Sequence, residues 1–332
     1  MILAQNVLFE LGLSSKDSMT NYHQVINFEG SGIFFMPDTT WLIDYTQFSE
    51  IFREIKQTSI QIVTVVYDIL PFTLHPSLIN SSHADNFKHW FHYILNNSDA
   101  LLTISKSEEA EIKNYLARNE YFNTPLVSHW PLGYKDLKKK QQEYEKHTFP
   151  FPKAPYLLMV GTVEPRKSHS LAFNSMELLW KKGFPLKLCI AGQINPEMRG
   201  FIRVVQNHPE FNKLCFFYEK PSDEHLHFLY KNARALLFLS QGEGFGLPLV
   251  EAASYGAEII CSDIPIFREI AGRFATYIKL GSAQCVAAQL EKWWKKSQVD
   301  PGPSTLGMPI LTWEESTKQL IDKLIKQTEI FE

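Results

Sequence analysis

Two glutamates, Glu243 and Glu251, stand eight positions apart in the stretch Glu-Gly-Phe-Gly-Leu-Pro-Leu-Val-Glu, around a Gly-X-Gly turn. The apolar run 235–240 before the turn indicates a buried strand, and the small residues of 250–256 after it indicate a helix that ends at a glycine. A strand, a glycine-rich turn and a helix N-terminus form an anion site from backbone groups alone. With a carboxylate at each end, the stretch suits a ligand with phosphates in the middle and hydroxyls at both ends, which is the chemistry of a nucleotide sugar.

Each glutamate has a place in such a ligand site. Glu251 lies four residues into the expected helix, where a carboxylate can accept hydrogen bonds from two ribose hydroxyls. Glu243 lies in the turn, nearer the position of a transferred sugar. The alternative for Glu251 is that it only supports the first helical turn through the helix dipole. The backbone N–H groups of Gly246, Leu247 and Leu249 are expected to face phosphate.

A second motif, Gly161-Thr-Val-Glu-Pro-Arg-Lys167, follows an apolar run and precedes a stretch of helical length. Arg166 offers a planar fork of donors and Lys167 a point charge, and together the two suit a diphosphate. The alternative is an exposed basic pair on an ordinary loop.

The first half of the chain offers Asp68, which ends a β-rich run. A lone aspartate at this position is commonly a cap or turn residue, so both readings stay open. The histidines lack metal-binding spacing, and no Asp-X-Asp motif stands ready to hold a divalent ion. Since no Gly-X-Ser-X-Gly or phosphate-loop lysine motif occurs either, we expect no metal and no cofactor.

Short, continuous apolar runs recur through the second half, with amphipathic stretches such as 171–182 and 223–232 between most of them. The expected strands are 156–161, 186–191, 214–218, 235–240, 258–262 and 275–278. Continuous apolar strands separated by helices predict a parallel α/β sheet covered on both faces, with its ligand at the carboxyl ends of the strands.

The first half predicts a second sheet of the same kind. Its expected strands are 32–36, 62–67, 100–104 and 126–129, and its expected helices are 48–56, 85–95 and 106–118. The proline-rich stretch 146–155 is interpreted as the interdomain linker. The sequence therefore predicts two Rossmann-like domains that face a cleft, 1–150 and 151–311. A closing helix within 312–332 is expected to return to the first domain.

Composition limits the function classes. The 332 residues carry a formal net charge of −3, which argues against general nucleic-acid binding, and 45% hydrophobic residues suit a globular core. The four cysteines show no pairing pattern, and three of them lie in or beside apolar runs, which predicts buried free thiols in a reducing compartment. With no apolar run of 18 residues and no signal-peptide pattern, the expected location is the cytoplasm, with the inner membrane surface as a further option.

Taken together, these motifs resemble the retaining family-4 glycosyltransferases of the GT-B fold. The match runs through 156–167, Leu188-Cys-Ile-Ala-Gly192, Ser222-Asp-Glu-His-Leu226, the Glu-X7-Glu stretch, 262–269 and 311–316. More loosely, 35–41, 65–71 and 100–106 resemble a branch that builds bacterial surface polysaccharides, including mannosyl- and rhamnosyltransferases.

The resemblance implies roles for individual residues. Arg166 and Lys167 would neutralise the donor diphosphate, Glu251 would hold the ribose and Glu243 would contact the donor sugar. Asp68 would lie near the same sugar, with Ser105 at the edge of the site. The donor-binding set would be completed by Gly161, Thr162, Gly244, Phe245, Gly246 and Leu247.

The implied activity is metal-independent transfer of a sugar, with retention, from a nucleotide sugar to a saccharide or lipid-linked saccharide. The family pattern has a histidine where Tyr67 stands, and a full first domain opens with a strand and a glycine-rich loop that are not visible before 32–36. The first domain is therefore expected to be shortened at its N-terminus, or the chain to be one part of a larger enzyme with other domains or subunits.

Three alternatives remain open at this point. A phosphorylase or nucleotide-sugar hydrolase would share the architecture, and a non-catalytic, partner-dependent subunit would share the fold. The lysines 138–140 and the aromatic stretch 89–93 could form a peripheral membrane face, or they could be a solvated charge run and core packing.

Overall fold

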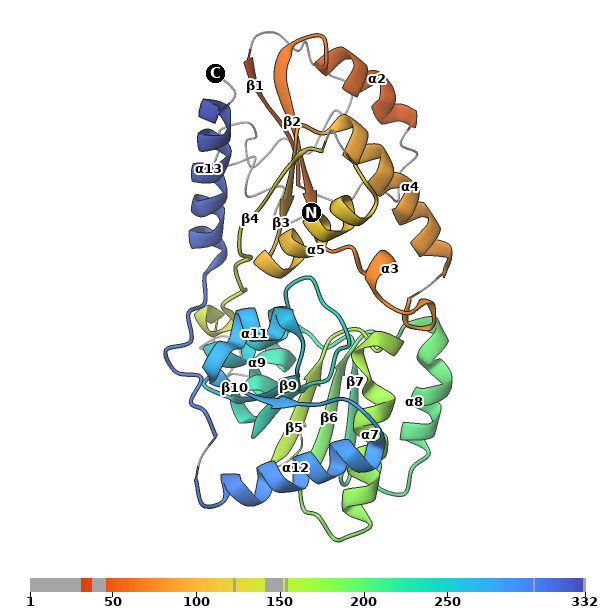
Figure 1. Ribbon diagram of the computed structural model, residues 1–332. Helices are drawn as coiled ribbons and strands as arrows, with labels where there is room; N and C mark the ends of the chain where they lie inside the picture. The colour runs from red at the N-terminus through yellow and green to blue at the C-terminus, as the bar shows by residue number, and fades with distance from the viewer. Residues whose placement is uncertain are drawn as a thin grey trace. The chain divides into compact units, whose positions relative to one another are not determined.

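Two parallel β-sheets organise the chain, one in each of two units (Figure 1). The computed structural model describes residues 31–37, 46–79, 81–121, 124–140, 152, 155–300 and 302–330. Unit 1 contains the described residues up to Pro76, those from 81 to Gly133 and the last helix from Trp313. Unit 2 contains Ser77–Ile79 and the described residues of Tyr134–Thr312. The domain limits and the closing helix expected from the sequence stay predictions, and most of the linker 146–155 and all residues before Ser31 lie outside the described residues.

The described sheet of unit 1 has the strand order β1-β2-β3-β4, with every neighbouring pair parallel. Its strands are β1 (Ser31–Met36), β2 (Ser59–Val66), β3 (Ala100–Thr103) and β4 (Leu126–His129). Its helices are α2 (Thr46–Ile55), α3 (Leu70–Thr73), α4 (Ser81–Asn97), α5 (Lys106–Arg118) and α13 (Trp313–Ile330).

Aromatic side chains fill the core between α4, α5 and the sheet of unit 1. Trp90 and Phe91 of α4 are fully buried beside Leu101 of β3 and Ile112 of α5. The last helix joins this unit through a hydrogen bond from Ser316 Oγ to the carbonyl of Pro131, at 2.6 Å.

Unit 2 has a six-stranded parallel sheet in the order β10-β9-β8-β5-β6-β7. The strands are β5 (Tyr156–Val160), β6 (Lys187–Gly192), β7 (Cys215–Glu219), β8 (Ala235–Phe238), β9 (Glu258–Ser262) and β10 (Ala275–Ile278). Counted from β5, the order across the sheet is 3-2-1-4-5-6, which is the Rossmann order. The order in which strands are added reverses at β5 and β8, since β6 and β7 lie on one side of this pair and β9 and β10 on the other. Ligands of such sheets bind at this point, outside the carboxyl ends of the strands.

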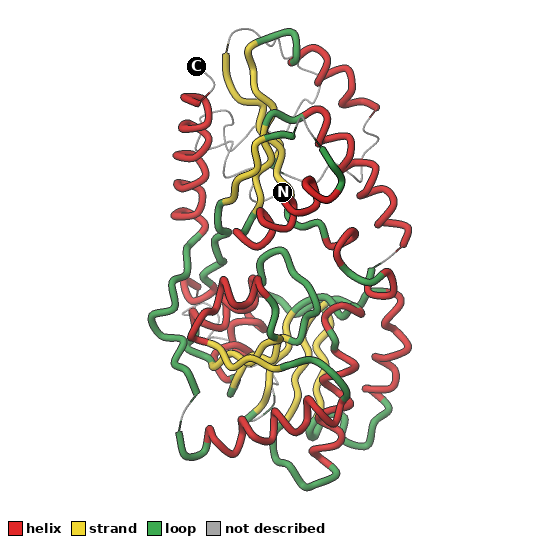
Figure 2. The backbone as a smooth tube through the Cα atoms, viewed as in Figure 1, coloured by secondary structure: helices red, strands yellow, loops and turns green. Residues whose placement is uncertain are grey.

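Helices cover both faces of this sheet (Figures 1 and 2). They are α7 (His169–Trp180), α8 (Arg199–Gln206), α9 (Asp223–Asn232), α10 (Leu247–Ser254), α11 (Pro265–Ala271) and α12 (Ala283–Ser297). Because every residue of β5 and β8 is buried, these strands are apolar throughout rather than alternating. The sequence prediction of a parallel α/β architecture is confirmed, and the expected strands occur with ends within three residues of their predicted positions.

Candidate functional site

The loops that follow β5 and β8 meet at the switch point of the unit 2 sheet. The first loop carries Gly161–Lys167 and the second carries Ser240–Gly246. They are joined where the backbone N–H of Gln241 donates to the carbonyl of Arg166 at 2.8 Å. The two motifs singled out in the sequence, which are far apart along the chain, are therefore neighbours in the structure.

Gly161 lets the first loop fold back on itself. Its φ of +126° lies in a region that side-chain-bearing residues rarely adopt, and a Cβ built on it would lie 2.7 Å from Lys167 Nζ. Pro165–Lys167 form a single 3₁₀ turn, after which Ser168 takes a left-handed conformation and α7 begins. Only glycine at position 161 lets the lysine ammonium lie against the strand end.

Two cations and two carboxylates form the centre of the site. Arg166 Nη1 lies 2.9 Å from Glu243 Oε2, and Arg166 Nη2 lies 2.9 Å from Glu164 Oε1. Lys167 Nζ lies 3.7 Å from Glu243 Oε1 and 3.9 Å from Glu164 Oε1. The four charges cancel, and since the Lys167 and Glu243 side chains are only 13% and 11% exposed, these pairs are poorly screened by solvent.

Glu243 has a second anchor, because Ser240 Oγ donates to its Oε1 at 2.8 Å. Arg166 Nη1 also donates to the carbonyl of Gly242 at 2.7 Å. Neither Glu164 nor Ser240 was assigned a role from the sequence. Glu164 stands inside the basic motif and Ser240 ends the apolar run, so position alone could have marked both.

The second loop turns into α10 at Gly246, whose φ is +101°. The backbone N–H of Leu249 donates to the carbonyl of Gly246 at 2.9 Å, so this amide is used within the turn rather than kept for a phosphate. Phe245 is a buried core side chain, so only its backbone can serve a ligand. Of the remaining expected donor residues, Thr162 is exposed, Gly244 is buried and Leu247 is half-buried.

Glu251 of α10 is held by a buried phenol from α9. Tyr230 Oη donates to Glu251 Oε2 at 2.6 Å, and the Tyr230 ring stacks on Tyr255. Burial raises the pKa of Glu251, and nearby Asp223 adds to this, although the Tyr230 hydrogen bond and the charges of Lys135 and Lys167 oppose it. One carboxylate oxygen of Glu251, Oε2, is thereby engaged.

His169, the first residue of α7, is buried directly behind the basic loop. Its Nδ1 has no hydrogen-bond partner in the part of the chain that the structure describes. Burial, together with the charge of Lys167, lowers the pKa of His169 to about 3. The imidazole is therefore neutral at physiological pH and adds no charge to the site.

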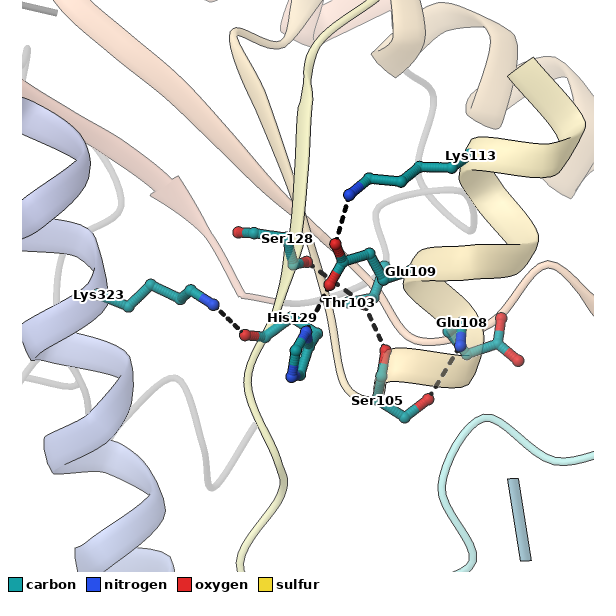
Figure 3. Close-up of polar contacts among 8 residues, drawn as sticks. All are labelled: Thr103, Ser105, Glu108, Glu109, Lys113, Ser128, His129 and Lys323. Atoms are coloured by element: carbon teal, nitrogen blue, oxygen red, sulfur yellow. Dashed lines mark hydrogen bonds and ion pairs between the residues drawn. The ribbon is translucent and has the colours of Figure 1, made fainter. Parts of the chain in front are cut away.

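Asp68 and Ser105 lie at the carboxyl edge of the unit 1 sheet. Asp68 Oδ1 accepts from the backbone N–H of Leu70 at 3.2 Å, and Ser105 Oγ caps α5 by accepting from the N–H of Glu108 at 3.1 Å (Figure 3). Glu108 Oε2 in turn accepts from the N–H of Ile69. These contacts are the turn and cap roles that the sequence left open for Asp68. They belong to unit 1, whereas the charged cluster belongs to unit 2.

Within the aromatic stretch 89–93, Trp90 and Phe91 belong to the core, since they are 1% and 0% exposed, whereas His89 is exposed. A membrane face made from those two rings is therefore excluded. Lys138 donates to the carbonyl of Ser254 at 2.6 Å, within unit 2. In the described part of the chain, no helix combines the length and apolarity needed to cross a membrane, and no cluster of three or more His, Cys, Asp or Glu could hold a metal ion.

Comparison with known proteins finds a family match for the region that carries the charged cluster. Residues 140–300 match the family "Glycosyl transferases group 1". The serotype-specific mannosyltransferase WbdA of Escherichia coli is 33% identical over 270 residues, which cover 78% of this chain and 33% of WbdA. The O-antigen chain mannosyltransferase RfbU of Salmonella typhimurium strain LT2 is 29% identical over 218 residues, which cover 64% of this chain and 55% of RfbU. The chain thus spans about a third of the length of WbdA and about half of RfbU.

Solved structures agree on the fold. Sucrose-phosphate synthase from Thermosynechococcus elongatus matches with a TM-score of 0.66 at 17% identity, covering 90% of this chain and 74% of that one. Anabaena HepE, solved with UDP and glucose, matches with a TM-score of 0.63 at 13% identity, covering 88% and 78%. At such identities these likenesses show the fold alone, which is the GT-B arrangement of two Rossmann-like domains.

Proposed function

Because this chain carries a glycosyltransferase group 1 domain, homologous to the O-antigen mannosyltransferases WbdA and RfbU, we propose that it transfers a mannosyl group from a nucleotide sugar to a saccharide hydroxyl. The reaction would serve the synthesis of a cell-surface polysaccharide, at the cytoplasmic side of the membrane. The acceptor would be a free or lipid-linked saccharide, with retention of configuration at the transferred carbon.

The charged cluster at the switch point carries this proposal. Arg166 and Lys167 supply the forked and point-charge donors that a diphosphate requires, at the sheet position where Rossmann-type ligands bind. When the ion pairs with Glu164 and Glu243 break, the two cations would bind the phosphates instead. The pair also offers a way to neutralise the leaving diphosphate without a metal ion.

Glu251 and Glu243 would bind the two ends of the donor, the ribose and the sugar. Oε1 of Glu251, held in place by Tyr230, would accept from a ribose hydroxyl. Glu243 would contact the sugar near its anomeric carbon, and backbone groups of Gly161, Thr162, Gly244, Phe245, Gly246 and Leu247 would line the donor. Asp68 of unit 1 is proposed to meet the same sugar.

Retention is explained by a displacement on one face of the sugar. The bond from the anomeric carbon to the phosphate oxygen breaks, and the acceptor oxygen bonds to the same carbon. The acceptor proton passes to the departing phosphate oxygen, so no carboxylate nucleophile is required. Catalysis then rests on charge stabilisation and positioning.

Donor binding tests the first part of the proposal. Thermal shift without added metal, against a panel of nucleotide sugars and free nucleotides, is expected to show stabilisation by one nucleotide class. The Glu251→Ala variant should lose that shift, whereas a variant of Glu291, a half-buried glutamate of α12, to alanine should keep it. If no nucleotide stabilises the wild type, the donor site is refuted.

Turnover tests the second part. Lys167→Ala should lower transfer by on the order of 10²-fold, as expected for loss of one electrostatic donor at a developing charge. Lys182→Ala removes an exposed lysine paired with Glu291 in the same unit and is the matched control. Equal turnover in the two variants would remove Lys167 from the site.

A partner-dependent subunit is the second candidate, because this chain matches only a third of the length of WbdA. In that case donor would bind to the isolated chain, and transfer would start only when a further domain or subunit is added. Donor binding without transfer would favour this candidate.

A further inference from the structure

A histidine and a glutamate meet at the carboxyl edge of the unit 1 sheet, outside the proposed donor site. His129 is the last residue of β4, and Glu109 lies near the start of α5, which follows β3. Ser105, between β3 and α5, stands at the same edge (Figure 3). Parallel α/β sheets bind their ligands outside this edge.

Contacts on three sides fix the histidine. Its Nδ1 contacts Glu109 Oε2, and the other oxygen of this carboxylate lies 2.5 Å from Lys113 Nζ. Lys323 of α13 donates to the backbone carbonyl of His129, and the N–H of Trp130 donates to the carbonyl of Thr103 at 2.9 Å. Both the ring and the strand that carries it are therefore held in one orientation.

These contacts determine which ring nitrogen of His129 faces the carboxylate. Burial would raise the pKa of Glu109, but hydrogen bonds and charges from Lys113 and His129 outweigh it and lower that pKa. An ionised carboxylate only accepts hydrogen bonds, so Nδ1 of the ring must carry the proton that it donates. In the neutral ring Nε2 is then an acceptor.

This acceptor nitrogen is within reach of a ligand. The His129 side chain is 25% exposed and that of Glu109 is 21% exposed, and Nε2 lies on the side of the ring away from Glu109 (Figure 3). When the ring is neutral, Nε2 is an acceptor that fits an uncharged donor, and the nearby Lys113 and Lys323 disfavour a cationic ligand. A sugar hydroxyl is such a donor.

We propose that His129, positioned by Glu109, binds a hydroxyl of the saccharide acceptor through Nε2. This inference rests on the proposed function, for which it adds a binding residue on unit 1. Glu109 is a positioning residue, since it acts only through the imidazole.

The test compares transfer of mannose to α-mannobiose with hydrolysis of the same nucleotide-mannose donor by water. His129→Ala should raise the KM for α-mannobiose about fivefold to tenfold, which is the effect of losing one neutral hydrogen bond. His129→Gln should restore much of the loss, because an amide oxygen can accept the same hydrogen bond. Glu109→Ala should raise the KM in the same direction, with a smaller change in kcat.

His92→Ala is the matched control. His92 lies in the same unit on α4, where its Nε2 is hydrogen-bonded to Tyr115 Oη at 2.9 Å. Loss of a structural histidine should lower thermal stability without raising the acceptor KM, so this comparison separates binding from folding.

The outcomes separate the inference from its premise. If the wild type neither hydrolyses the donor nor transfers the sugar, the proposed function fails. If it transfers and His129→Ala keeps the wild-type acceptor KM, the histidine inference is overturned while the function stands. Hydrolysis without any transfer to α-mannobiose would overturn the inference for mannosyl acceptors.

Discussion

Replacing Gly192, the last residue of β6, should disable the basic loop without touching a charged residue. A Cβ built on Gly192 would lie 1.9 Å from the carbonyl oxygen of Gly161 and 2.5 Å from its carbonyl carbon. Real Cβ atoms essentially never approach within 3.0 Å, so in Gly192→Ala the two segments must move about 1 Å apart. The obstacle is backbone, which cannot rotate out of the way.

The movement acts directly on the proposed diphosphate site. Gly161 packs against Lys167 Nζ, so displacing its peptide displaces the ammonium that we assign to the donor. A misplacement of about 1 Å at a reacting group can lower a rate by roughly 10²-fold. We therefore expect about that loss of transfer, together with roughly 1–3 kcal/mol of destabilisation from overpacking.

The assay is initial-rate transfer at a temperature where urea unfolding shows the variant to be folded. Gly200→Ala on α8 is the control, since nothing lies within 4 Å of its Cβ position. Alanine favours a helix over glycine by roughly 1 kcal/mol, so this control should be at least as stable as the wild type and equally active. A folded Gly192→Ala protein with more than half of the wild-type activity would refute the assignment of the loop.

Four further predictions concern single side chains. Tyr230→Phe removes a hydrogen bond to the Glu251 carboxylate worth roughly 1.5–3 kcal/mol, so the donor KM should rise about tenfold or more with a smaller change in kcat; an unchanged KM would separate the phenol from the donor site. Glu243→Gln removes one of two carboxylates that compete with phosphate, so calorimetry should show tighter binding of free nucleoside diphosphate while transfer slows. His169 has a pKa lowered to about 3, so the free energy of unfolding should fall by up to about 1.4 kcal/mol per pH unit as the pH drops from 6.5 towards 3. Urea unfolding of His169→Gln should show a weaker dependence of this free energy on pH in the same range. Burial raises the pKa of Cys215 to about 12, so stability should fall as the pH rises from 9 towards 12; an equally steep alkaline branch in Cys215→Ala would contradict this.

The elements of the fold could be predicted because parallel strands leave a strong signal. Strands buried on both faces, such as β5 and β8, read as unbroken apolar runs with polar residues after them. Helix α5 was predicted to the residue, since Ser105 is a capping residue and Arg118 is followed by Asn119. The strand order could not be predicted, because pairing of β5 with β8 depends on contacts between residues about 80 positions apart.

The sequence predicted candidate site residues but not the contacts between them. Arg166, Lys167 and Glu243 carry chemistry that the sequence displays, and the structure brings them together. The role of Tyr230 depends on where α9 packs against α10, which no local pattern reveals. The contact between Glu109 and His129 could not be predicted for the same reason, because it depends on how β4 packs beside α5.

The charge balance of the cluster suggests how donor binding and sugar contact are linked. Glu243 is an ion-pair partner of both cations, and it is also the carboxylate proposed to contact the sugar. A diphosphate that takes over Arg166 and Lys167 would release Glu243 at the moment when a sugar becomes available to it. Ser240 would limit how far the carboxylate moves, since it holds Oε1 independently of the cations. Arrival of the phosphates and positioning of the sugar contact would then be one event.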